Sequence, residues 1–124
     1  MSTLAATHAV RAITATVDAL EAGGVTATND AGAFHPRPLG VLVGLPSLID
    51  RGLGQRTFAI PVHVVSADPL NSLRAVDGLY EIADLACTAL GADNYAPAEW
   101  IGGVNVEPLP SLLITATVTV SEVP

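Results

Sequence analysis

The sequence contains no lysine, a single cysteine and few aromatic residues. Without lysine, the chain lacks both the lysine of a phosphate-binding loop and a basic stripe for contacting nucleic acid. The one cysteine, Cys87, cannot form an internal disulfide, and its apolar neighbours in DLACTAL predict core packing. No uninterrupted apolar run reaches the ~18 residues of a membrane-spanning helix, so no membrane partner is expected.

Apolar residues make up 50% of the chain and charged residues only 14%, which is more apolar than an ordinary soluble monomer. This surplus predicts self-association of a single domain spanning residues 1–124. The first residues do not resemble a signal peptide, so we expect the protein to remain in the cytoplasm where it is made. The whole net charge of −7 lies in residues 63–124, where Arg74 is the only arginine, because acids and arginines balance in residues 1–62. Such an acidic half lets a polyanion pass without adhering.

Apolar residues at steps of three and four predict two amphipathic helices. The first covers residues 3–22 with Ser2 or Thr3 as N-cap, and it buries Val10, Ile13, Val17 and Leu20. The second covers residues 67–91, with Asp68 as N-cap, Pro69 in the first turn and Gly91 as the stop. On the second helix Asp77, Glu81 and Asp84 share one face, which we expect to be either solvated or the acidic inner wall of an assembly.

Between and after the helices, several segments have the composition of strands. They are residues 25–28, 39–45, the alternating segment from Thr57, residues 99–107, and residues 111–122. Residues 46–56 are expected to form a long connection rather than a tight hairpin, and residues 92–100 a loop. The predicted fold is α+β: a mixed, mostly antiparallel sheet with two helices packed on one face, in the order α-β-β-β-α-β-β.

The segment TFAIPVHVVSADP (residues 57–69) has a proline inside a strand. Its alternation places Phe58, Ile60, Val62 and Val64 under the helices, and Pro61 and His63 toward a loop, solvent or another subunit. Because proline cannot donate to a sheet ladder, we expect an edge strand or a bulge at Pro61.

Catalytic and cofactor signatures are weak. His63 with Asp68 and a serine, Ser47 or Ser66, would make a nucleophilic triad, so a small cytoplasmic hydrolase is one alternative. No nucleophile elbow surrounds either serine, and the histidines lack the spacing of metal ligands. We therefore predict no enzyme, no cofactor and no metal. Another alternative is an adaptor that binds an extended peptide at a free sheet edge.

The order of elements, with LGVLVGLP, RTFAIPVHVVSADP and the terminal GGVNVEPLPSLLITATVTVSE, resembles the tail terminator family of long-tailed bacteriophages. More narrowly, it resembles small tail proteins of actinobacterial phages, and the resemblance covers nearly the whole chain. It implies a virion protein that forms a ring, a hexamer, at the head-proximal end of the tail. There it would stop polymerisation of the tail tube protein and join the tail to the head connector protein, with DNA passing through unbound. Another neck or tail-completion protein is the alternative within this class.

Residues 46–56 combine apolar side chains with arginine, a composition typical of protein interfaces. We therefore expect this segment to contact another subunit or the tail tube, together with the Pro61 and His63 side of the following strand. The candidate interface residues are Leu48, Ile49, Arg51, Leu53, Arg56, Pro61 and His63.

Overall fold

The computed structural model describes residues 7–30, 34, 36, 39–67, 72–101 and 108–121. Its elements follow the predicted order α-β-β-β-α-β-β, so the expected α+β fold is confirmed. They are α1 (His8–Ala22), β1 (Leu39–Val43), β2 (Ser47–Gly52), β3 (Gln55–Ser66), α2 (Leu73–Leu90), β4 (Tyr95–Trp100) and β5 (Leu109–Ser121).

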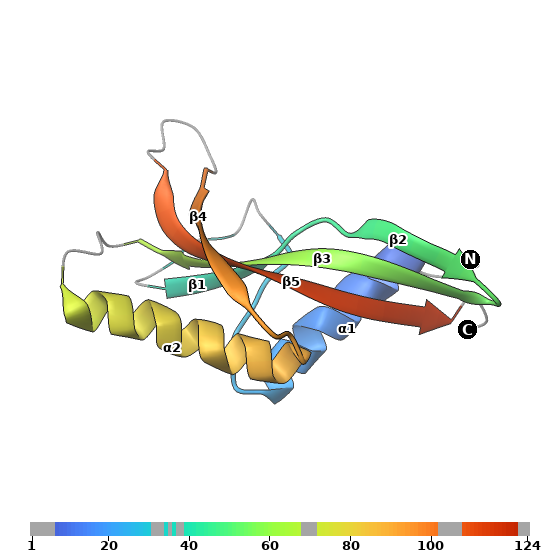
Figure 1. Ribbon diagram of the computed structural model, residues 1–124, viewed down its shortest axis with the longest axis horizontal. Coiled ribbons are helices and arrows are strands. Elements are labelled where there is room, and N and C mark those ends of the chain that lie inside the picture. Colours follow the sequence, from blue (N-terminus) through green and yellow to red (C-terminus); the bar gives the residue numbers. More distant parts are fainter. Residues whose placement is uncertain are drawn as a thin grey trace, which may run out of the picture.

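The strands form one five-stranded sheet in which every strand pairing is antiparallel (Figure 1). Its order is β1-β3-β5-β4, and β2 also pairs with β3. β2 pairs with residues 55–59 of β3, and β1 pairs with residues 62–66, so the two short strands share one long neighbour. The strand expected at residues 25–28 is reduced to a single parallel bridge from Thr28 to Leu42.

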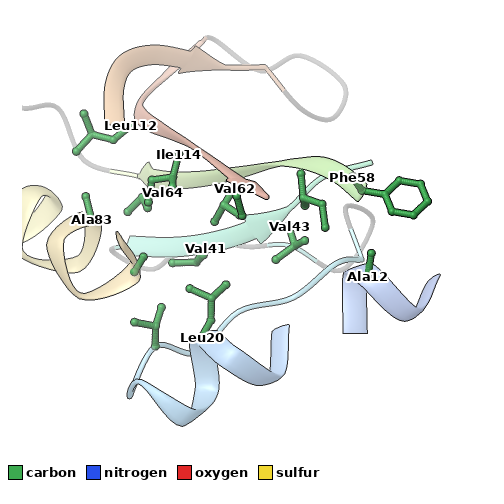
Figure 2. Close-up of a cluster of buried hydrophobic side chains, with 14 of the residues drawn as sticks. Ala12, Leu20, Val41, Val43, Phe58, Val62, Val64, Ala83, Leu112 and Ile114 are labelled. Atoms are coloured by element: carbon green, nitrogen blue, oxygen red, sulfur yellow. The ribbon is translucent and has the colours of Figure 1, made fainter. Parts of the chain in front are cut away.

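Both helices pack on the same face of the sheet, as predicted, and the main core lies between the layers (Figure 2). The β3 residues expected beneath the helices are buried, with exposed fractions of 6% or less: Phe58, Ile60, Val62 and Val64. One prediction for α1 is wrong, because Val10 is 48% exposed. Leu20 is buried as predicted, and beside it the helix turns Ala12 and Thr16 inward, whose small side chains allow close approach to the sheet.

A second, smaller cluster lies on the opposite face of the sheet. Phe34 packs edge-on against Trp100 with ring centroids 5.2 Å apart, and Leu42, Val65 and Leu109 complete this outer cluster. Gly40 makes room for it, since a Cβ at Gly40 would lie 2.6 Å from the Phe34 ring. Trp100 thus serves packing on this face of the sheet.

Both helices begin later than expected. Thr7 caps α1 by accepting a hydrogen bond from the Val10 N–H, and Ser72 caps α2 by accepting one from the Ala75 N–H. The predicted caps are therefore wrong, and the residues named for them, Ser2, Thr3 and Asp68, lie outside the described residues, as does Pro69. The predicted stop at Gly91 is confirmed, because Gly91 has a left-handed φ of 65° that suits glycine.

Two segments expected to be loops are strands. Residues 47–52 form β2, which returns tightly into β3, so the expected long connection at 46–56 is wrong. Residues 95–100, inside the expected loop, form β4, which is held as a strand by pairing with β5. The strand expected at 99–107 is thus displaced toward the N-terminus, and residues 102–107 lie outside the described part.

Candidate functional site

The segment predicted to make contacts forms a projecting hairpin. β2 and β3 are joined by a two-residue turn, Leu53-Gly54, and both turn residues have positive φ, 46° and 77°. Positive φ at both positions is the geometry of a type I′ turn, which matches the twist of antiparallel strands. We call residues 47–59 with their β5 partners 117–121 the arm. In Figure 1 the tip of the arm extends beyond the described ends of both helices.

Apolar side chains on the arm face solvent. Leu48 is 51% exposed, Ile49 is 57% exposed, and Leu53 at the tip is fully exposed. The pairing of β2 with β3 shifts register between Leu48 and Asp50, so Ile49 has no partner in the ladder and forms a bulge. The three predicted apolar contact residues therefore lie on one projection, available to another molecule.

The two arginines of the arm are directly opposite each other. Arg51 on β2 and Arg56 on β3 are cross-strand partners, so their side chains lie on the same face of the hairpin. Like charges placed opposite each other repel within one molecule. This arrangement places two arginines beside the exposed leucines, against Asp50 as the one acid among the arm residues, and an acidic surface would complement this excess.

Pro61 lies in a central strand, so the expectation of an edge strand is wrong. On one side it pairs with Thr115 of β5, and on the other its carbonyl accepts a hydrogen bond of 2.8 Å from the Gly44 N–H. Gly44 belongs to the link between β1 and β2, where pairing with β3 is interrupted. The missing N–H of Pro61 faces this interruption, because the N–H and C=O of one strand residue point the same way. The strand thus tolerates proline without losing a bond to β5.

His63 lies on the sheet face opposite the helices, as predicted, but half-buried. Its cross-strand partners are Leu42 and Leu113, and burial lowers the pKa of its imidazole, which favours the neutral form. Its Nδ1 atom is buried without a hydrogen-bond partner. A general base needs a group that orients it, and the proposed partner Asp68 lies outside the described residues.

Ser111 is also buried with a polar atom that has no hydrogen-bond partner, and the sequence pattern did not predict this. It is 3% exposed, and its Oγ atom has no hydrogen-bond partner. Ser111 and His63 lie on the same face, because their ladder positions on β5 differ by two residues. A serine at the start of an alternating strand gives no indication of burial, since alternation does not reveal what covers each face.

The acids of α2 are exposed, as expected for a solvated face. Asp77, Glu81 and Asp84 all lie on the solvent side of the helix, and Asp84 accepts a hydrogen bond of 2.8 Å from the Tyr95 hydroxyl. That hydrogen bond raises the pKa of Tyr95, and burial and the Asp84 charge add to the effect. The Tyr95 ring also packs edge-on against Tyr80, so β4 is fastened to α2 along this flank.

The sequence also gave no sign of a depression along the first half of α2. It has a volume of about 670 Å³ and is lined by Leu73, Arg74, Val76, Asp77 and Tyr80. Leu73, the first residue of α2, is 88% exposed at the rim. We call this depression the α2 groove.

Cys87 is half-buried against the main core, as predicted, and burial, followed by the nearby Asp84 charge, raises the pKa of its thiol. Among the described residues no three His, Cys, Asp or Glu side chains come together as metal ligands. Neither of the two described helices is long and apolar enough to span a membrane. Comparison with known protein families and with curated proteins gives no match.

Proposed function

We propose that this protein is a structural component of a long-tailed phage particle, a tail terminator that assembles into a ring at the head-proximal end of the tail. In this role it stops growth of the tail tube and provides the surface that joins the tail to the head connector. The proposal combines the resemblance in element order with the exposed apolar arm. A closely related neck or tail-completion protein is the alternative within this class.

The arm is the observation that carries the proposal. Monomeric proteins rarely leave several large apolar side chains together on a projecting hairpin. Here Leu48, Ile49 and Leu53 are exposed on one projection, whereas the core side chains of β3 are almost fully buried. A ring needs two different contact patches on each subunit, and such an arm is suited to be one of them.

The distribution of charge is consistent with a DNA passage. A ring through which DNA moves requires a wall that does not bind phosphate. Residues 63–124 carry eight acids and one arginine. Carboxylates of this half that face the passage would repel a duplex.

Electron microscopy of the purified protein, alone and with polymerising tail tube protein from the same genome, tests the proposal. We expect rings, and tubes whose growth stops at a bound ring. A variant with Leu48→Ser and Ile49→Ser should stay folded, because both side chains face solvent, yet assemble less. A wild-type protein that remains monomeric at high concentration and does not bind tubes would contradict the proposal.

A further inference from the structure

We propose that the arm of one copy inserts into the α2 groove of the next copy. This inference rests on the proposed ring and names the two patches that would form its repeated contact. The occupant of the groove is thus a second molecule of this chain.

The two surfaces match in shape and in polarity. The arm is a convex projection that ends in a fully exposed leucine, Leu53. The groove is a concavity of about 670 Å³ whose lining includes the apolar side chains of Leu73, Val76 and Tyr80. A projecting leucine that enters such a depression removes apolar surface from water on both molecules.

The two surfaces differ in their balance of charge. On the arm Arg51 and Arg56 outnumber Asp50, the one acid among its residues. Asp77 lines the groove, and Glu81 and Asp84 continue the exposed acidic face along the helix, against a single cation in the lining, Arg74. Complementary charge fixes orientation and suppresses wrong pairings, so the arginines would set the register of the inserted arm.

Leu53 has a backbone conformation that the fold alone does not favour. Its φ of 46° lies in the left-handed region, where a bulky residue is strained and asparagine or glycine is preferred at this turn position. A strained residue with a fully exposed side chain contributes nothing to the core of its own molecule. A contact with a second copy gives this leucine a role.

Pairing of sheet edges is a less suitable contact. β4, at one end of the sheet, contains Pro97, and proline at an edge has no N–H to offer an added strand. The other edge is shared by β1, which Thr28 covers through a parallel bridge, and β2, which is interrupted by the bulge at Ile49. Bulges are a common means of blocking edge pairing. Side-chain insertion does not depend on these backbone groups.

The position of the two patches favours a head-to-tail contact. The tip of the arm and the N-terminal end of α2 lie at opposite ends of the long axis (Figure 1). A contact between two different patches repeats from copy to copy and closes into a ring when each step includes the right rotation.

Charge reversal followed by mixing tests the pairing. Arg51→Glu and Asp77→Arg should each weaken self-association, measured by sedimentation velocity, by about tenfold or more, since close charge pairs across interfaces are strongly coupled. An equimolar mixture should recover association, because each arm then meets a groove residue of opposite charge in an alternating ring. Asp18→Arg, the same change at an exposed position of α1, is the matched control and should associate as the wild type does. Circular dichroism checks that every variant is folded.

The outcomes separate this inference from the proposed function. If the wild type forms rings and both reversed variants form them equally well, the arm-to-groove contact is wrong while the ring stands. If both variants associate weakly and their equimolar mixture associates no better, the arm-to-groove pairing is also wrong. A wild type that is monomeric both alone and with tail tube protein overturns the ring and the contact together.

Discussion

At the scale of single residues, the face of the sheet opposite the helices contains two polar side chains with unsatisfied atoms. His63 Nδ1 and Ser111 Oγ are both buried without a partner. Buried polar atoms of this kind destabilise a fold unless they serve a purpose or receive an ordered water. The cross-strand neighbours of His63, Leu42 and Leu113, offer no charge to stabilise an imidazolium.

The first prediction concerns pH. Burial lowers the pKa of His63 in the folded protein, whereas in the unfolded chain it stays at about 6.5. As the pH falls, the unfolded chain therefore takes up the proton first. The free energy of unfolding is fully retained above about pH 6.5 and decreases as the pH falls from there toward the lower folded pKa.

His63→Gln removes the imidazole that takes up this proton. The free energy of unfolding of the variant should therefore fall less between about pH 7.5 and pH 5.5 than that of the wild type. Urea denaturation at the two pH values measures the difference. An equal loss in both proteins would show that His63 does not contribute to acid sensitivity.

At the scale of elements, the residue that would best stabilise the turn of the arm is not the residue that would best contact another copy. Asn at position 53 suits the left-handed conformation of this turn better than leucine does. Leu53→Asn should therefore raise the free energy of unfolding by up to about 1 kcal/mol. The same change removes the apolar tip, so we expect weaker self-association from a more stable protein.

Leu53→Met is the matched control, because methionine keeps an apolar tip in the same turn. It should associate much as the wild type does, without the gain in stability. Thermal denaturation and sedimentation velocity together distinguish the two effects. If Leu53→Asn associated as strongly as the wild type, the leucine would have no role in contact.

The elements also show where sequence reasoning succeeds. β3 and β5 were predicted because their alternation is long and unbroken, with one face buried by helices. β2 was missed because the bulge at Ile49 breaks its alternation and Leu53-Gly54 lacks the asparagine that marks a tight hairpin. β4 was missed because it contains Pro97 and depends on pairing with β5, which no local pattern reveals.

The candidate site was predicted in a similarly partial way. Composition singled out Leu48, Ile49 and Leu53, and the structure exposes all three on the arm, although their conformation was predicted wrongly. Apolar residues beside arginine have the composition of an interface whether they lie in a loop or in a strand. The α2 groove was not predicted, since its rim residue Leu73 fits the apolar spacing of a buried helix face. Periodicity gives the direction of a side chain but not the presence of a covering layer.

At the scale of the whole molecule, two electrostatic effects on assembly have opposite signs. Each copy carries a net charge of −7, so copies repel one another as they approach. Within the proposed contact, in contrast, Arg51 and Arg56 face the acids of α2 and attract. The two effects differ in range, and salt therefore separates them.

The screening length falls from about 30 Å at 0.01 M salt to about 10 Å at 0.1 M and about 3 Å at 1 M. A domain of this size has a radius of gyration of roughly 14 Å, so raising the salt from 0.01 M to 0.1 M removes most of the repulsion between whole copies. Raising it further to 1 M weakens the close charge pairs within the contact. Self-association should therefore be strongest near physiological salt and decrease toward 1 M.

Sedimentation velocity across this range of salt measures the effect, with Asp77→Asn as the comparison. That variant loses one attractive carboxylate in the groove, so its association should decrease less between about 0.15 M and 1 M salt than that of the wild type. A wild-type association that rises steadily up to 1 M would mean that apolar burial alone holds the copies together. In that case the arginines of the arm would not fix its position in the groove, and Leu53 would be the main contact.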